Sequence, residues 1–157
     1  MFNRIKYLWL IIFVVSCQNT KSVIEVPSEI NNLFDNYNRA WSDGNVNEIV
    51  NNVYSVPFIL YLADNVLVLN TENDIRDFLT NTFAQLEENE YGHSTFNRWE
   101  HVKVNEGVAL VEQNFTRYLK DGSVMGASER TASYILRKHD DSGYKIFALI
   151  PHTPVSE

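Results

Sequence analysis

Residues 91–149 decide the fold, and they read YGHSTFNRWEHVKVNEGVALVEQNFTRYLKDGSVMGASERTASYILRKHDDSGYKIFAL. Turn signals interrupt the β-branched and aromatic residues of this stretch at Glu106-Gly107, at Asp121-Gly122 and at residues 140–143. Pairs such as Asp-Gly supply the positive φ that a tight hairpin requires. We therefore predict four successive antiparallel strands, near residues 93–104, 108–120, 123–138 and 144–150.

The turns also predict which side chains share a face of this sheet, because opposed residues in a hairpin point the same way. On this register Glu100, Gln113 and Arg130 lie side by side, on a face whose many small and aliphatic residues favour helix cover. If buried, they must satisfy one another or a ligand. The row is either a structural Glu–Arg pair or the polar floor of a pocket. A β-bulge would reverse a strand and cancel this assignment.

Helix signals come before this stretch. One apolar stripe with helical spacing follows a capping pattern at Ser28, and it comprises Ile30, Leu33, Phe34, Tyr37 and Trp41. A shorter helix follows from an Asn45 cap, and a third begins at Thr71 with Asp74 three residues later. Between them, two apolar runs at residues 57–62 and 66–69 predict a hairpin. The fold class is α+β, with three N-terminal helices packed on an antiparallel sheet.

Composition limits the classes of function. The 157 residues are 45% hydrophobic, enough to bury one core and too few for two ordinary domains. A formal net charge of -7 repels phosphates, so we expect no nucleic acid partner. The histidines show no metal-binding spacing, and they are His93, His101, His139 and His152. Nucleophile and nucleotide motifs are absent from the sequence, so we expect neither a metal nor a cofactor.

The N-terminus has the pattern of an export signal. Arg4 and Lys6 precede an apolar run over residues 7–15, which is shorter than the ~20 residues of a membrane-spanning helix. Residues 14–17, Val-Val-Ser-Cys, resemble the bacterial lipobox, whose cysteine is diacylated and becomes the new N-terminus. Cys17 is the single cysteine of the chain, so it forms no internal disulfide. A plain secretory signal with an unmodified cysteine is the alternative.

This pattern predicts the organisation of the chain and its location. We expect a signal peptide over residues 1–16, the lipidated Cys17 with a tether to residue 27, and one domain over 28–157. Acyl chains then attach an acidic domain to a membrane. Gln18, rather than an aspartate, follows the cysteine, which resembles the sorting preference for the outer membrane. The expected location is the bacterial cell envelope, on the outer membrane facing the periplasm.

The order of elements and three short motifs resemble the NTF2-like superfamily, near its SnoaL-like branch. The motifs are RAWSDGN at 39–45, RTASYILRK at 130–138 and GYKI at 143–146. The resemblance spans residues 28–150 and implies a strongly curved sheet wrapped over three helices, with a cone-shaped pocket. Its members include isomerases, dehydratases, cyclases and non-catalytic binders, so the fold leaves the activity open. Leu62 occupies the position of the catalytic acid in the steroid-isomerase branch.

Two functions follow from these observations. The preferred one is a lipid-anchored, non-catalytic module that binds a small, largely apolar ligand or serves as an accessory domain. Its pocket residues are Tyr37, Trp41, Tyr61, Glu100, Gln113 and Arg130. The alternative is an isomerase or dehydratase of small cyclic apolar substrates, with Glu100 as acid–base and Arg130 as electrostatic support.

Further expectations concern the face opposite that row. Sheet-to-sheet pairing is usual among similar folds, so we expect a homodimer, with Trp99 on its surface. His101 and Glu112 are expected on the same face, either as a cross-strand pair or as a base with its orienting acid.

Overall fold

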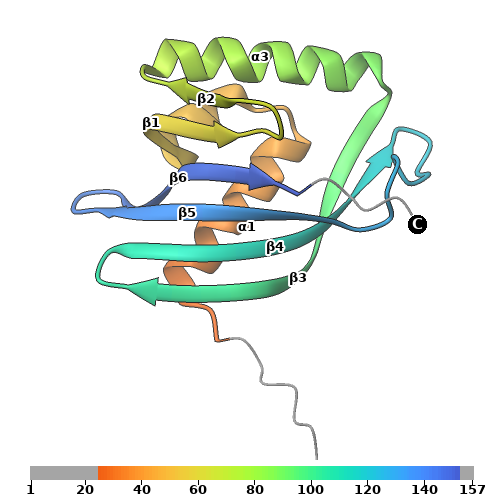
Figure 1. Cartoon of the computed structure of the whole chain (residues 1–157). Helices are drawn as coiled ribbons and strands as arrows, with labels where there is room; N and C mark the ends of the chain where they lie inside the picture. The colour runs from red at the N-terminus through yellow and green to blue at the C-terminus, as the bar shows by residue number, and fades with distance from the viewer. Residues whose placement is uncertain (1–24, 153–157) are drawn as a thin grey trace, which may run out of the picture.

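A computed structural model describes residues 25–152. The helices are α1 (Ser28–Ser42), α2 (Val46–Glu48), the π-helical turn η1 (Ile49–Val53) and α3 (Glu72–Glu88). The strands are β1 (Tyr54–Tyr61), β2 (Val66–Leu69), β3 (Tyr91–Asn105), β4 (Val108–Leu119), β5 (Arg130–His139) and β6 (Gly143–Pro151). They form one sheet in the order β2-β1-β6-β5-β4-β3 (Figure 1). The α+β class is therefore as predicted.

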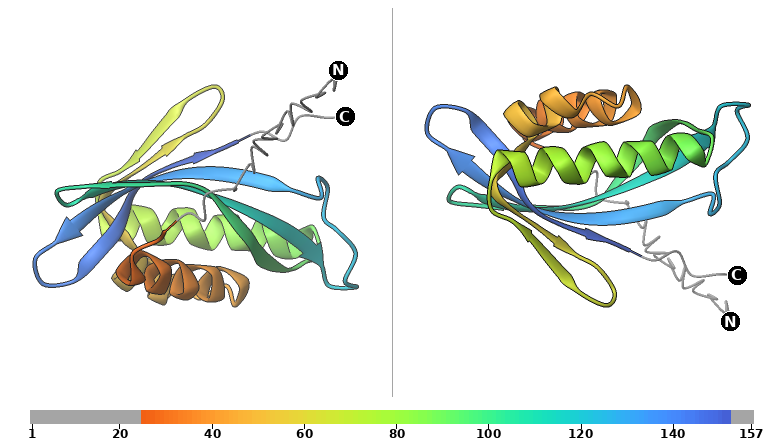
Figure 2. Two further views of the ribbon diagram at one scale, coloured as in Figure 1. Left: turned by 90° about the horizontal axis from the view of Figure 1, so that it is seen from below. Right: turned by 90° about the horizontal axis from the view of Figure 1, so that it is seen from above.

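The sheet is mixed, which corrects the prediction of an antiparallel one. Neighbouring strands pair antiparallel except β1 and β6, which run parallel. The two meet only after the whole chain between them has folded, so no local pattern reveals their direction. Both α1 and α3 lie on one side of the sheet, and the β1–β2 hairpin bends away from them (Figure 2). Strands β2 and β3 remain as edges, so the sheet is not closed.

Local signals set the helix boundaries. The Asn45 side chain accepts a hydrogen bond from the Glu48 N–H, and Thr71 forms a capping box with Asp74, both as predicted. The cap predicted at Ser28 is wrong. Ser28 is the first helical residue, and the backbone carbonyl of Pro27 accepts the first bonds of α1. None of the helices within residues 25–152 is both long and apolar enough to cross a membrane.

The hydrophobic core fills the space between the helices and the inner face of the sheet. Its side chains are at most 1% exposed at Ile30, Phe34, Ile49, Val53, Tyr54, Phe58, Ile75, Leu79, Ala109, Val111, Leu136, Ile146 and Ala148. Each large one contributes about 1.5–3 kcal/mol by leaving water. The inner face thus belongs to the core, and the outer face has no helix over it among the described residues (Figure 2).

Two bulges in β3 overturn the predicted register. The pairing with β4 shifts between Phe96 and Arg98 and again between Trp99 and His101. Trp99, not Glu100, therefore opposes Gln113, on the inner face. A single inserted residue reverses the facing of those that follow it. The predicted row of Glu100, Gln113 and Arg130 is wrong for this reason.

The segment before β5 also differs from the prediction of a strand over 123–138. Backbone bonds from Leu119 N–H to Ser123 O and from Gly122 N–H to Leu119 O close a turn. One isolated bridge joins Tyr118 and Val124, and regular pairing resumes only at Arg130. The Asp121-Gly122 signal thus marks a turn that leads into a loop.

Candidate functional site

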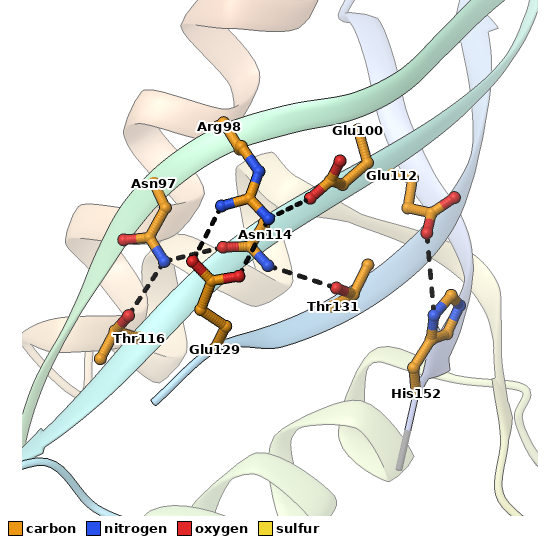
Figure 3. Close-up of polar contacts among 9 residues, drawn as sticks. All are labelled: Asn97, Arg98, Glu100, Glu112, Asn114, Thr116, Glu129, Thr131 and His152. Carbon is orange, nitrogen blue, oxygen red and sulfur yellow. Dashed lines mark hydrogen bonds and ion pairs between the residues drawn. The ribbon is translucent and has the colours of Figure 1, made fainter. Parts of the chain in front are cut away.

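Two polar regions lie on opposite faces of the sheet. We call the first the inner pocket, and its lining consists of Tyr37, Asn38, Trp41, Ser94, Gln113, Phe115, Arg117 and Tyr134. We call the second the outer cluster, and its members are Asn97, Arg98, Glu100, Glu112, Asn114, Thr116, Glu129, Thr131 and His152 (Figure 3). Of the residues predicted from the sequence, Tyr37, Trp41 and Gln113 belong to the inner pocket and Glu100 to the outer cluster. Tyr61 and Arg130 belong to neither.

The inner pocket lies between α1 and the sheet and has aromatic walls. Its volume is about 300 Å³, with the open solvent at its mouth included. The Tyr37 ring meets those of Trp41 and Tyr134 at centroid distances of 5.8 and 5.9 Å. The lining therefore offers ring surfaces to an apolar group.

The neutral polar residues of the pocket are buried at Gln113 and half-buried at Asn38 and Ser94. Gln113 is 1% exposed, and its Nε2 donates to Asn38 Oδ1 at 2.9 Å. The Tyr37 and Tyr54 hydroxyls lie 3.3 Å apart. Burial raises the pKa of Tyr37, and it raises those of Tyr54 and Tyr134 further. These hydroxyls are therefore neutral at physiological pH and act as hydrogen-bond donors or acceptors, not as bases.

Arg117 is the charged residue of the pocket lining. Its guanidinium carbon lies 5.9 Å from the Trp41 ring centroid and 5.7 Å from that of Phe115. Its Nε is buried and has no hydrogen-bond partner within residues 25–152. None of the ion pairs in this part of the chain includes it. An unpaired charge beside two aromatic rings is therefore available to a ligand.

Arg130 lies next to this pocket but not where the sequence placed it. It opposes Phe115, whereas Gln113 opposes Ala132. Its Nη2 donates to the Met125 carbonyl at 2.9 Å, and its buried Nε lacks a partner in the described chain. Burial and the nearby charge of Arg117 lower the pKa of Arg130. Arg130 thus adds positive charge beside the pocket without lining it.

Amide and hydroxyl groups form the centre of the outer cluster. Asn97 Nδ2 donates to Asn114 Oδ1 at 2.8 Å and to Thr116 Oγ1 at 2.9 Å. Asn114 Nδ2 in turn lies 3.4 Å from Thr131 Oγ1. Asn114 and Thr116 are 2% and 6% exposed. These buried groups satisfy one another.

Arg98 is the cation of the outer cluster and has two carboxylate partners. Its two terminal nitrogens donate to both oxygens of Glu129, at 3.0 and 2.9 Å, and Nη2 lies 2.7 Å from Glu100 (Figure 3). The hydrogen bond from Arg98 lowers the pKa of Glu129. Glu100 therefore lies on the outer face and pairs with Arg98 instead of Arg130. This geometry contradicts the predicted pairing of Glu100 with Arg130 in one pocket.

The histidines of the outer face make cross-strand contacts. His101 opposes Glu112, as the sequence predicted. His152 adds a contact that the sequence did not reveal, with Nδ1 3.8 Å from Glu112 Oε1 and Nε2 2.9 Å from Ser133 Oγ. Within residues 25–152, no group of histidine, cysteine and carboxylate side chains has the geometry to hold a metal ion.

Two further aromatic predictions need correction. Tyr61 lies on the β1–β2 hairpin, is 40% exposed and does not line the inner pocket. Trp99 lies on the inner face, where its ring packs edge-on against Phe34 at 4.9 Å and Nε1 donates to Asn31 Oδ1. The second bulge turns it inward, so Trp99 does not mark a dimer surface.

The structure also brings in pocket residues that the sequence did not single out. They are Asn38, Ser94, Phe115, Arg117 and Tyr134. A signal for Arg117 exists, since it follows Gln113 and Phe115 at a spacing of two and so shares their face. Tyr37, Trp41 and Gln113 are the predicted pocket residues that the structure does bring together. Cys17 lies outside the described residues.

Comparison with known proteins concerns almost the whole described region. A family model described as NTF2-like protein (DUF6841) matches residues 28–154. A domain of unknown function with a cystatin-like fold from Nostoc punctiforme superposes with a TM-score of 0.63 and 17% identity, over 82% of this chain and 77% of that one. For an NTF2-like superfamily protein from Salmonella enterica, the values are 0.60 and 14%, over 82% and 91%.

A third similar structure is an NTF2-like protein of unknown function from Shewanella oneidensis. Its TM-score is 0.59 at 16% identity, over 79% of this chain and 96% of that one. No curated protein matches the sequence. Identities this low show a shared fold and leave activity to the site itself.

Proposed function

The chain belongs to the NTF2-like family DUF6841, and from this premise we propose that it is a non-catalytic module that binds a small, largely apolar ligand in the inner pocket. One observation carries the proposal. The walls of the pocket are four aromatic rings, and its lining includes no aspartate, glutamate, histidine or cysteine. Such a pocket can enclose an apolar body, but its lining offers neither a carboxylate base nor a histidine that could activate the Ser94 hydroxyl.

The enzymatic alternative requires a base in the inner pocket, and the position of Glu100 argues against it. Proton transfer requires a group that titrates near the working pH and lies within hydrogen-bond reach of the substrate. Glu100, the residue predicted for this role, is on the outer face and paired with Arg98. The tyrosines of the pocket region have raised pKa values and are not bases near neutral pH. Binding without turnover is the function that this geometry supports best.

The ligand can be tested by native mass spectrometry of the full chain purified from its host and released from detergent. The protein should retain a small molecule whose mass stays unchanged on incubation. Trp41→Ala removes one wall of the pocket and should lose this mass. Trp99→Phe is the matched control, since Trp99 is outside the lining, and it should keep the mass. Wild-type protein without any retained mass, or conversion of the molecule, would contradict the proposal.

Lipid attachment is a second part of the proposal. Cys17 carries the acyl chains, residues 18–27 tether the domain, and the module works in the cell envelope, on the outer membrane facing the periplasm. The support is the short apolar run and the lipobox-like residues 14–17. Labelling with an alkynyl fatty acid should mark the wild type but not Cys17→Ser, which should leave the membrane fraction. Equal labelling of both would exclude lipidation at this residue.

We also propose placement in the SnoaL-like branch and assembly as a homodimer. The outer face of the sheet has no helix over it among the described residues, so it is available to a second copy. Light scattering should give twice the mass of the chain. A monomer at every tested concentration would end this part of the proposal and leave the binding function unaffected.

A further inference from the structure

The acidic residues of this chain leave the inner pocket without a counterion. The sequence has 20 acidic residues against 13 lysines and arginines. In the described chain, Arg98 pairs with Glu100 and Glu129, and Lys138 pairs with Glu29. Arg117 has no such partner there, although acids are abundant. Other cations of this region, such as Lys103 and Arg137, are in no ion pair either, so the informative feature of Arg117 is its buried Nε, which has no hydrogen-bond partner there.

Burial of the Arg117 Nε–H without a hydrogen-bond partner is energetically unfavourable unless a ligand accepts a hydrogen bond from it. The Nε of Arg130 has the same defect on the same face. A buried donor that lacks a partner loses its hydration without compensation, and the loss is larger for a charged group. Two such guanidinium groups near one another also repel, since the Arg117 charge lowers the pKa of Arg130. An anion at this point would relieve both penalties.

The lining of the pocket favours an anion that carries an apolar body, because four of its eight residues are aromatic. A carboxylate matches the planar fork of an arginine. Trp41 and Phe115, whose rings lie beside the Arg117 guanidinium, offer ring surfaces to an apolar body.

We infer that the ligand of the inner pocket is a small carboxylate with an apolar or aromatic body, and that Arg117 binds its carboxylate group. The inference rests on the proposed binding function and names its ligand class. Arg130 contributes charge from beside the pocket, while Trp41 and Phe115 contact the body.

Benzoate and its neutral counterpart benzamide form a matched pair of probes for this inference. Each is titrated into the full chain at neutral pH, and the indole N–H signal of Trp41 is followed by NMR. Benzoate should bind at least about tenfold more tightly than benzamide, as a charge-assisted hydrogen bond predicts. Arg117→Gln and Arg117→Met should both abolish this preference. Arg98→Gln, which changes an arginine on the outer face, should retain it.

The possible results separate the inference from the proposed function. Equal affinity of the wild type for benzoate and benzamide would contradict the inference that the ligand is a carboxylate, and it would leave the proposed binding function unaffected. No shift with either probe would overturn both. A preference for benzoate that survives in both Arg117 variants and disappears in Arg130→Gln would refute the assignment to Arg117.

Discussion

Strand β4 contributes residues to both the inner pocket and the outer cluster, yet the arginine of the outer cluster is paired with carboxylates and the arginine of the inner pocket is not. Gln113 and Asn114 are consecutive on β4, point to opposite faces and are both almost fully buried. On the outer side Arg98 has two carboxylate partners, whereas on the inner side Arg117 has none within the described residues. A set of polar groups that satisfy one another serves the fold. A buried group left unsatisfied points to a ligand.

The largest expected effect tests which face β3 presents inward. Trp99→Ala should lower the free energy of unfolding by about 3 kcal/mol, since it removes a large ring from the core side. His101→Ala, two residues further on the outer face, should change it little. Urea titrations of both variants measure the difference. A loss below about 1 kcal/mol for Trp99→Ala would mean that the bulges are misplaced and the two faces wrongly assigned.

The next effect tests whether the outer cluster is structural. Asn114→Ala should cost about 2 kcal/mol, because it leaves the amide of Asn97 and the hydroxyl of Thr131 without their buried partner. Benzoate binding should stay unchanged. Chemical denaturation and the NMR titration together check this. Intact stability combined with weakened binding would assign the cluster to the ligand instead.

A substitution in the inner pocket is expected to raise the free energy of unfolding, by less than the two preceding substitutions lower it. Arg117→Met keeps contact with the Trp41 and Phe115 rings but removes the buried N–H that lacks a partner. The free energy of unfolding of the empty protein should rise by about 1 kcal/mol, because the change removes the desolvation cost of a buried donor that lacks a partner. Arg98→Met should give no gain. Destabilisation by Arg117→Met would show that the wild-type protein satisfies this arginine without a ligand.

The smallest effect concerns pH and again separates the two arginines. The hydrogen bond from Arg98 lowers the pKa of Glu129, so this carboxylate contributes stability above its unfolded pKa. The contribution is lost as the pH falls through its folded pKa. In Arg98→Gln the carboxyl ¹³C signal of Glu129 should titrate at a higher pH than in the wild type. Arg117→Gln should leave the pH at which Glu129 titrates unchanged. A change of that pH in Arg117→Gln would show that the two regions are electrostatically coupled.

Local patterns in the sequence predicted much of this architecture. Asn45 and Thr71 end the preceding loops because their side chains accept helix N–H groups, which depends only on nearby residues. The turn at Glu106-Gly107 joins β3 and β4 for the same reason, with positive φ at both residues. Tyr37 and Trp41 fall in the pocket because their helical spacing directs them to the sheet.

The bulges and the parallel pairing depend on contacts between distant parts of the chain. Phe96 and Trp99 are three residues apart, so a regular strand would separate them onto opposite faces. Burial of Trp99 against Phe34 favours the bulged form, and that contact exists only in the folded protein. The sequence pattern predicts Glu100 on the wrong face for this reason. It does not single out Arg117, because the lack of a partner for its Nε exists only in the folded protein.

The most direct measurement is of the Arg117 side chain itself. The Nε–H signals of the arginines can be recorded by NMR with and without benzoate, and the Arg117→Gln variant assigns the relevant one. The carboxylate should shift the Arg117 signal downfield and slow its exchange with water, while the Arg98 signal stays in place. An unmoved Arg117 signal at saturating benzoate would contradict the claim that its unpaired charge is the binding site.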